Sequence, residues 1–169
     1  MTDRYAVIGN PIAHSKSPTI QAAFAASTGQ DMSYERLLAP LDGFRATVER
    51  FAADGGLGLN VTIPFKLEAF ELATETTQRA RLAGAVNTLK RIDGGWLADN
   101  TDGAGLVRDL MHNHGIVVTG QAVAILGAGG AVRGILKPLL DAGAVSVAVS
   151  NRTMAKAEAP LLPLSRRVR

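Results

Sequence analysis

The spacing of apolar residues along the first part of the chain distinguishes segments typical of strands from segments typical of helices. Short apolar runs with the length of strands occur at 5–8, 33–38, 57–63, 85–91 and 96–99. Between them, apolar residues recur at helical spacing at 18–27, 41–53, 67–72 and 78–82. Asp93-Gly94-Gly95, between the last two strand-like runs, is typical of a hairpin turn. We therefore expect a mixed sheet covered by helices in an α/β domain over residues 1–101.

The rest of the chain predicts a smaller unit. Residues 102–114 have the pattern of a helix, which together with the turn up to 119 forms a linker. A strand at 121–126 that is apolar on both faces, a glycine-rich turn, a helix ending near residue 142 and a strand at 145–150 form one βαβ unit. The expected fold class is therefore α/β, with a mixed-sheet N-terminal domain followed by an incomplete Rossmann-like dinucleotide-binding domain over residues 120–169.

Composition and charge narrow the classes of function. The chain of 169 residues is 47% hydrophobic and 20% charged, contains no cysteine and has no apolar run of membrane-spanning length. No signal peptide pattern opens the chain, and we expect a cytoplasmic protein without a membrane partner. The net charge of +3 comes from Arg166, Arg167 and Arg169; without them 15 basic residues face 15 acidic ones. This balance argues against a nucleic-acid partner.

Asn60-Val-Thr-Ile-Pro-Phe-Lys66 is the stretch around which the first domain is organised. Pro64 cannot donate to a sheet ladder, so the strand ends at or before Ile63. Asn60 and Thr62 then lie at the carboxyl end of a strand, where α/β sheets bind ligands, and Lys66 follows within one turn. The alternative is an ordinary strand-to-helix turn with a solvated lysine, and spacing alone favours this alternative, because short patterns often match by chance.

Ser15 and Ser17 follow the first strand and precede Pro18, so Ser17 is expected to be the N-cap of the next helix. Two hydroxyl groups near a helix N-terminus are able to hold a carboxylate, although without further context a cap and a turn residue are the more common explanation. We predict no metal site. His112 and His114 are two residues apart on a helix and cannot share a face, and His14 has no partner at ligand spacing.

Gly127-x-Gly129 follows a strand and opens a helix, which is the setting of a dinucleotide-binding turn. Val132 replaces the third glycine of the usual fingerprint. The next strand ends in Asn151-Arg152-Thr153, followed by Lys156, where an NAD site would carry an acidic residue. Two cations, a hydroxyl and an amide suit a 2′-phosphate, so the predicted cofactor is NADP; a solvated strand end is the alternative.

Together these motifs resemble those of the shikimate dehydrogenase family. Six pieces match in order over residues 5–156: 7–18, 60–66, Gly84-Ala-Val-Asn-Thr88, Asp99-Asn-Thr-Asp-Gly103, Gly127-Ala-Gly-Gly-Ala131 and 151–153. The family interconverts shikimate and 3-dehydroshikimate with NADP, in the biosynthesis of chorismate and the aromatic amino acids. The expected partners are accordingly these small molecules, with a homodimer as a further expectation.

The resemblance also assigns roles to residues. It implies that Ser15 and Ser17 hold the substrate carboxylate, and that Lys66 and Asp102 form the catalytic pair. The ring hydroxyls would be bound by Asn60, Thr62, Asn87 and Asp102. The implied cofactor residues are Gly127, Ala128, Gly129, Gly130, Ala131, Asn151, Arg152, Thr153 and Lys156. Whether Lys66 accepts the proton or stabilises charge on the oxygen stays open, because a nearby Asp102 would favour a charged lysine.

The chain departs from the family pattern at its end. Family members are longer, and residues 157–169, with Pro160 and Pro163, differ from them in composition. We expect a C-terminally truncated member with weak shikimate binding and little or no turnover. Two other hypotheses are a quinate and shikimate dehydrogenase with NAD as an alternative cofactor, and a catalytically silent remnant.

Overall fold

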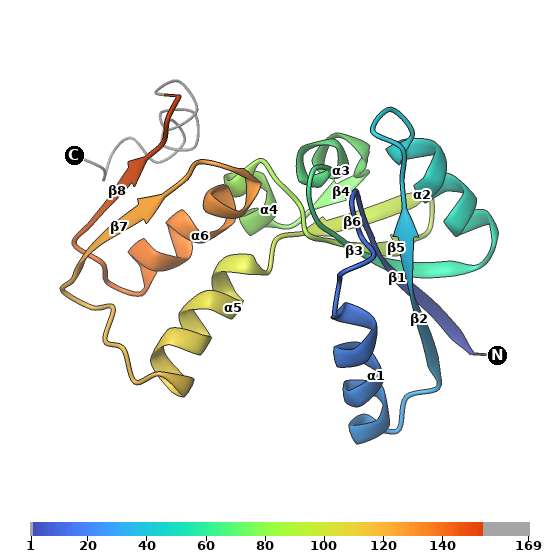
Figure 1. The fold of residues 1–169 in the computed structure, drawn as a ribbon, viewed down its shortest axis with the longest axis horizontal. Helices are drawn as coiled ribbons and strands as arrows, with labels where there is room; N and C mark the ends of the chain where they lie inside the picture. Colours follow the sequence, from blue (N-terminus) through green and yellow to red (C-terminus); the bar gives the residue numbers. More distant parts are fainter. Residues whose placement is uncertain (1, 154–169) are drawn as a thin grey trace. The chain divides into compact units, whose positions relative to one another are not determined.

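The computed structural model describes residues 2–153, which form two compact units. The first unit contains the chain up to Thr76 together with Val86–Asp99, and the second contains Thr77–Ala85 together with the chain from Asn100 onward (Figure 1). Each unit is therefore built from two separate stretches of sequence. Among the described residues, no helix is long and apolar enough to cross a membrane.

The first unit is a six-stranded mixed sheet with three helices. The strands are β1 (Asp3–Gly9), β2 (Met32–Leu38), β3 (Gly56–Val61), β4 (Glu75–Thr76), β5 (Thr88–Ile92) and β6 (Gly95–Asp99), and the helices are α1 (Ser17–Thr28), α2 (Phe44–Ala53) and α3 (Lys66–Leu72). The strand order is β2-β1-β3-β5-β6-β4. β1 is parallel to both of its neighbours, whereas β5 is antiparallel to β3 and β6. The predicted mixed sheet is therefore confirmed.

Aromatic side chains from α2 and from the turn before α3 fill the core of this unit. Phe44 and Phe65 are almost fully buried, and their rings stack with centroids 5.0 Å apart. The Phe51 ring packs onto Gly56, where an added Cβ would lie 2.2 Å from the ring. By contrast, α1 buries only Ala25, and its Phe24 is 60% exposed. Most of the buried helix side chains of this unit thus come from α2 and α3.

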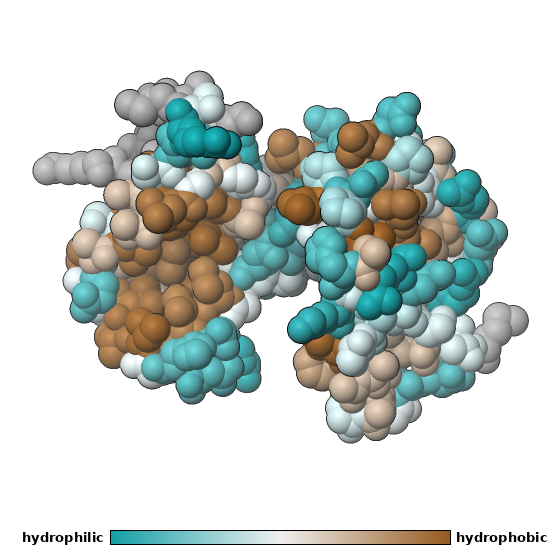
Figure 2. Space-filling model, in the orientation of Figure 1, coloured by the Kyte–Doolittle hydropathy of each residue, from teal (hydrophilic) through white to brown (hydrophobic). Residues whose placement is uncertain are grey.

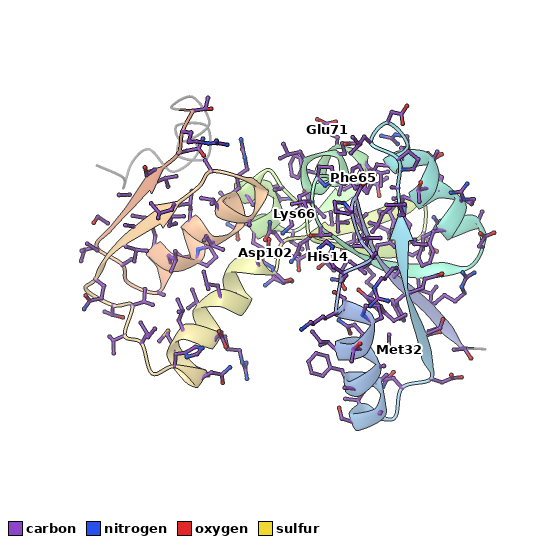
Figure 3. The ribbon with its side chains drawn as sticks, in the orientation of Figure 1. His14, Met32, Phe65, Lys66, Glu71 and Asp102 are labelled. Atoms are coloured by element: carbon purple, nitrogen blue, oxygen red, sulfur yellow. The ribbon has the colours of Figure 1, made fainter. Side chains whose placement is uncertain are left out.

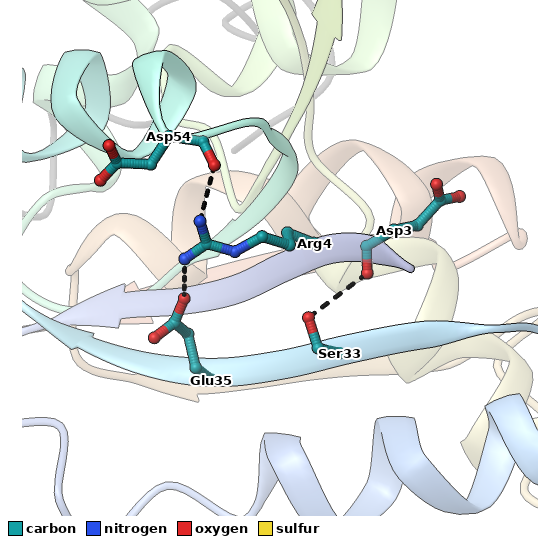
Figure 4. Close-up of polar contacts among 5 residues, drawn as sticks. All are labelled: Asp3, Arg4, Ser33, Glu35 and Asp54. Atoms are coloured by element: carbon teal, nitrogen blue, oxygen red, sulfur yellow. Dashed lines mark hydrogen bonds and ion pairs between the residues drawn. The ribbon is translucent and has the colours of Figure 1, made fainter. Parts of the chain in front are cut away.

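Arg4 connects three elements near the start of β1 (Figure 4). Its guanidinium donates to Glu35 Oε1 on β2 at 2.9 Å and to the carbonyl oxygen of Asp54, after α2, at 2.6 Å. Within the same strand pair, Ser33 Oγ of β2 donates to the Asp3 carbonyl oxygen of β1 at 3.5 Å. These groups are exposed, so each contact contributes little to stability and mainly fixes local register.

The second unit combines three helices with a two-stranded parallel sheet. Its elements are α4 (Gln78–Ala83), α5 (Asp102–Arg108), the π-helical turn η1 (Asp109–Asn113), β7 (Ala122–Leu126), α6 (Gly130–Asp141) and β8 (Ser146–Ser150). β7 and β8 pair in parallel from Ala122 opposite Ser146 to Leu126 opposite Ser150, with α6 between them in sequence. The predicted βαβ unit is therefore confirmed, although the helix expected over 102–114 changes to π-helical geometry after Arg108.

Packing in this unit is one-sided. Val132, Leu136 and Leu139 of α6 form a buried cluster with Val147 of β8. The outer face of the strand pair is uncovered among the described residues: Leu126 is 87% exposed. Figure 2 shows apolar side chains gathered on the second unit over β7 and α6. The strand at 121–126, predicted to be apolar on both faces, is thus covered on one face only.

Candidate active site

The connection between β1 and α1 places Ser15 and Ser17 side by side. Ser15 Oγ donates to Ser17 Oγ at 3.2 Å and accepts the backbone N–H of Ser17 at 3.3 Å. The expectation that Ser17 caps α1 is wrong. The N-cap is Lys16, without a side-chain cap bond, and Ser17 is the first helical residue. Because its hydroxyl does not cap the helix, it stays usable for a ligand. Both serines are half-buried.

The turn after β3 lies against the same connection. The backbone N–H of Asn10 donates to the carbonyl oxygen of Ile63 at 3.0 Å, which joins the two turns. Thr62 packs over Gly9, where an added Cβ would lie 2.6 Å from the Thr62 methyl group. Asn60, the next-to-last residue of β3, accepts a hydrogen bond of 2.6 Å from the Tyr34 hydroxyl. The missing side chain at Gly9 therefore lets the ends of β1 and β3 approach closely.

Lys66 is the first residue of α3, as Figure 3 shows. A tight turn leads into it, in which the N–H of Phe65 donates to the Thr62 carbonyl oxygen at 3.0 Å. Val86 N–H donates to the Lys66 carbonyl oxygen at 2.8 Å and so ties this helix start to the segment before β5. The Lys66 residue is half-buried.

Asn87 lies between the ends of two strands. Its carbonyl oxygen accepts from Val61 N–H at 2.8 Å, and its N–H donates to Asp99 at 3.1 Å. Its side-chain Oδ1 accepts from the Thr88 hydroxyl at 2.9 Å. Six predicted site residues thus belong to one edge of the first unit, at the ends of β1 and β3 and the start of β5: Ser15, Ser17, Asn60, Thr62, Lys66 and Asn87.

Asp102 belongs to the second unit, as the first residue of α5. Its backbone N–H donates to Oδ1 of Asn100 at 3.2 Å, and Asn100 is almost fully buried. The position of Asp102 on its own helix is therefore well fixed. Its pairing with Lys66 remains a prediction.

The glycine-rich turn follows β7. Gly127 has a φ of +113°, and its N–H donates to the Ser150 carbonyl oxygen at 2.7 Å. Gly129 is the N-cap of α6, where an added Cβ would meet no atom of the described chain within 4 Å. No packing contact there demands a glycine at 129, and the open space fits a ligand that approaches the backbone N–H groups closely. Ala128, Gly130 and Ala131 complete the turn.

Asn151, Arg152 and Thr153 follow β8, and Asn151 Nδ2 donates to the Thr153 carbonyl oxygen at 3.0 Å. Because Leu126 and Ser150 are opposite each other in the parallel pair, the glycine-rich turn and this segment leave the same edge of the sheet. The Arg152 side chain is exposed at that edge. The residues present therefore fit a phosphorylated dinucleotide, whereas Lys156 lies outside the described residues.

Two residues of β2 support the site but belong to none of the sequence motifs. Arg36 donates from Nε and Nη2 to the Ser15 carbonyl oxygen, at 2.8 and 2.5 Å. Tyr34 holds Asn60, and burial raises the pKa of its hydroxyl to about 12. A cavity of about 490 Å³ extends from Tyr34 and Asn60 along the sheet, lined further by Tyr5, Gln21, Met32 and Leu89. Asn60 is the predicted site residue that lines it.

Comparison with known proteins identifies these features. Residues 7–89 match the family model described as the shikimate dehydrogenase substrate binding domain. A shikimate dehydrogenase (NADP(+)) of Janthinobacterium sp. is 60% identical over 156 residues, which are 92% of this chain and 57% of the relative. The enzyme of the same name from Herminiimonas arsenicoxydans is 62% identical over 93% of this chain and 58% of its own length. The chain thus spans less than two thirds of these relatives.

Solved structures agree with the sequence comparison. Shikimate dehydrogenase from Aquifex aeolicus matches with a TM-score of 0.89 and 34% identity, over 96% of this chain and 60% of that one. The Thermus thermophilus shikimate 5-dehydrogenase in complex with NADP(H) and shikimate matches with a TM-score of 0.88 and 34% identity, over 99% and 63%. Through its residues 7–89 and the fold that surrounds them, the chain belongs to the shikimate dehydrogenase family.

Proposed function

We propose that this chain binds shikimate and 3-dehydroshikimate and takes part in their NADP-dependent interconversion, a step toward chorismate and the aromatic amino acids. The observation that carries the proposal is the gathering of hydroxyl, amide and ammonium groups at one edge of the first unit, at Ser15, Ser17, Asn60, Thr62, Lys66 and Asn87. The names of the relatives support the choice of substrate and cofactor.

The chemistry of shikimate suits these groups. The ligand is a cyclohexene ring with one carboxylate and three hydroxyls. The paired hydroxyls of Ser15 and Ser17 would donate to the carboxylate, since bonds to a charged acceptor are stronger than bonds between neutral groups. The amides of Asn60 and Asn87 both donate and accept, as a ring hydroxyl requires. The half-buried setting of these residues limits competition from water.

Lys66 and Asp102 would manage the proton of the reacting hydroxyl. When the alcohol becomes a ketone, its C–H bond loses a hydride and its O–H bond loses a proton; bound NADP supplies the hydride acceptor. Lys66, at the start of α3, would hold its ammonium toward the oxygen on which charge changes. Asp102 would bind a hydroxyl and influence the charge state of the lysine.

The glycine-rich turn and the end of β8 would hold the cofactor. Backbone N–H groups at Gly129 and Gly130 would donate to the pyrophosphate at the N-terminus of α6, with Gly127, Ala128 and Ala131 shaping the turn. Asn151, Arg152 and Thr153 would meet the 2′-phosphate of NADP. Lys156 is proposed to add a second cation to that phosphate. A cytoplasmic location and a homodimer also remain proposals.

Calorimetric titration tests the proposal. We expect shikimate and NADP each to bind the 169-residue chain, with quinate binding more weakly than shikimate and NAD more weakly than NADP. NADPH formation from shikimate should be measured in parallel. If turnover of the chain itself is too low to detect, the same assay is made on a chimera. In this chimera the residues after Thr153 come from the Janthinobacterium relative. Absence of shikimate binding in both proteins would refute the proposed substrate.

A further inference from the structure

We propose that Tyr34 is a positioning residue of the candidate site, which orients the Asn60 amide toward a bound hydroxylated carboxylic acid. The inference rests on the proposed function, because it concerns the same site. Tyr34 lies outside the family motifs, and only the three-dimensional structure brings it to Asn60.

The sheet register explains how Tyr34 reaches a residue two strands away. Tyr34 on β2 is opposite Tyr5 on β1, and Tyr5 is opposite Gly58 on β3. Asn60 is two residues beyond Gly58, so its side chain lies on the same face of the sheet as that of Tyr34. Gly58 has no side chain, and an added Cβ would lie 3.0 Å from the Tyr5 ring. The Tyr5 ring therefore rests over Gly58 and leaves the Tyr34 hydroxyl free to reach Asn60 Oδ1 at 2.6 Å.

The same strand also supports the serine turn. Arg36 is two residues after Tyr34 on β2 and so lies on the same face. Its guanidinium makes two hydrogen bonds to the Ser15 carbonyl oxygen. These bonds use the backbone of Ser15 and leave its hydroxyl available. β2 thus holds both halves of the site, the serine turn through Arg36 and the end of β3 through Tyr34.

The Tyr34 hydroxyl is a donor in this group. It donates to Asn60 Oδ1, while Ser15 Oγ donates to Ser17 Oγ. Burial raises the pKa of Tyr34 to about 12, against a smaller opposite effect of the Ser17 side chain. Tyr34 therefore stays protonated at neutral pH and donates to Asn60.

The Tyr34 hydrogen bond determines which end of the Asn60 amide faces a ligand. Because Oδ1 is held toward the Tyr34 hydroxyl, the Nδ2 group faces away from Tyr34, and it donates. Asn60 should therefore select a ligand oxygen that accepts at that position. Without the Tyr34 hydroxyl, the Asn60 amide is free to rotate and to present either end, so its selectivity and part of its affinity are lost.

The variants Tyr34→Phe and Tyr5→Phe form a matched pair, since both remove one hydroxyl from adjacent tyrosines and the hydrogen bond to Asn60 Oδ1 comes from Tyr34. In ¹⁵N-resolved NMR spectra of the free protein, we expect Tyr34→Phe to shift or broaden the side-chain NH₂ resonances of Asn60, with Tyr5→Phe leaving them in place. In calorimetric titrations, Tyr34→Phe should raise the Kd for shikimate roughly tenfold, the loss expected for one ordered hydrogen bond, and leave the Kd for NADP unchanged.

A double-mutant cycle tests whether Tyr34 acts through Asn60. In an Asn60→Ala background, Tyr34→Phe should change the shikimate Kd by less than about twofold, because the group it positions is gone. Equal effects of Tyr34→Phe in both backgrounds would overturn the proposal, as would unchanged Asn60 resonances in Tyr34→Phe. If shikimate binds to none of these proteins, the proposed function fails, while the NMR comparison still decides the role of Tyr34.

Discussion

The Nδ2 group of Asn100 donates a hydrogen bond of 2.9 Å to the carbonyl oxygen of Ala85, and the Asn100 side chain is almost fully buried. The same amide accepts from the N–H of Asp102 through its Oδ1. One side chain therefore connects the segment that carries α4 to the start of α5, and it fixes the helix on which Asp102 lies.

Asn100→Ala should destabilise the second unit by about 1–3 kcal/mol, because the Ala85 carbonyl and the Asp102 N–H lose a buried partner. Chemical denaturation monitored by circular dichroism measures this loss. Asn113→Ala, which removes an exposed amide that donates to Asp109, is the control and should change the free energy of unfolding by less than about 0.5 kcal/mol. Equal stabilities of the two variants would contradict the structural role of Asn100.

Two glycines of α5 provide a second matched pair. A Cβ on Gly103 would lie 2.4 Å from the Gly134 carbonyl oxygen of α6, whereas a Cβ on Gly105 would meet nothing within 4 Å. We expect Gly103→Ala to lower the unfolding free energy by about 1–3 kcal/mol through overpacking. Gly105→Ala should raise it by up to about 1 kcal/mol, since alanine favours the helix. A stabilising Gly103→Ala would show that the two helices do not approach so closely.

In the full-length chimera, Lys66→Ala should lower the rate of NADPH formation from shikimate by about a hundredfold or more and change the shikimate Kd much less, because a group that handles the proton acts mainly on the transition state. Steady-state kinetics combined with titration separates the two quantities. Lys90→Ala, an exposed lysine on β5, is the control and should leave both unchanged. A Lys66→Ala protein with parental turnover would exclude a catalytic role.

Arg152→Ala should weaken NADP binding by roughly ten- to a hundredfold and hardly affect NAD, since the cofactors differ only in the 2′-phosphate. Titration with both nucleotides measures the difference. Arg108→Ala removes another exposed arginine of the second unit and should leave both affinities intact. If Arg152→Ala weakened NAD and NADP equally, the phosphate contact would be wrongly assigned.

Tyr34 should ionise at unusually high pH. The chain has two tyrosines, and burial raises the pKa of Tyr34 from 10.0 to about 12. A pKa raised in the folded state means that the stability linked to this proton is complete below pH 10 and is lost as the pH rises toward 12. Tyrosinate absorbance should show a late transition that disappears in Tyr34→Phe. Persistence of the late transition in that variant would assign it to Tyr5.

The sequence predicts the strands and helices well where apolar spacing is regular. The structure contains both the mixed sheet and the βαβ unit. They are predictable because the spacing of apolar residues and the positions of glycine and proline determine them locally. Ser17 is different, because the cap depends on where the helix begins, and α1 begins one residue earlier than the position of Pro18 suggests. The π-helical turn after Arg108 leaves the helical residue pattern unchanged, so the sequence does not reveal it.

The candidate site is predictable to the extent that motifs contain it. Ser15, Asn60 and Lys66 belong to local motifs whose residue types already indicate a ligand. Tyr34 belongs to no such motif, and an aromatic residue within a strand is typical of a core position. Its partner Asn60 is 26 residues away and two strands across, so only the strand order β2-β1-β3 brings the two together.

The backbone passes between the two units three times, after Thr76, Ala85 and Asp99. The consequence concerns partial unfolding. If the second unit opens, residues 77–85 become a flexible loop within the first unit, and the entropic cost of a loop grows only slowly with its length. The strand β5 then still pairs with β3, and β6 still pairs with β5. A fragment that ends after Asp99 keeps α4 but lacks α6, the helix that α4 contacts in the folded chain. Hydrogen exchange should therefore show α4 opening together with α6, although the strands on either side of α4 in sequence remain protected.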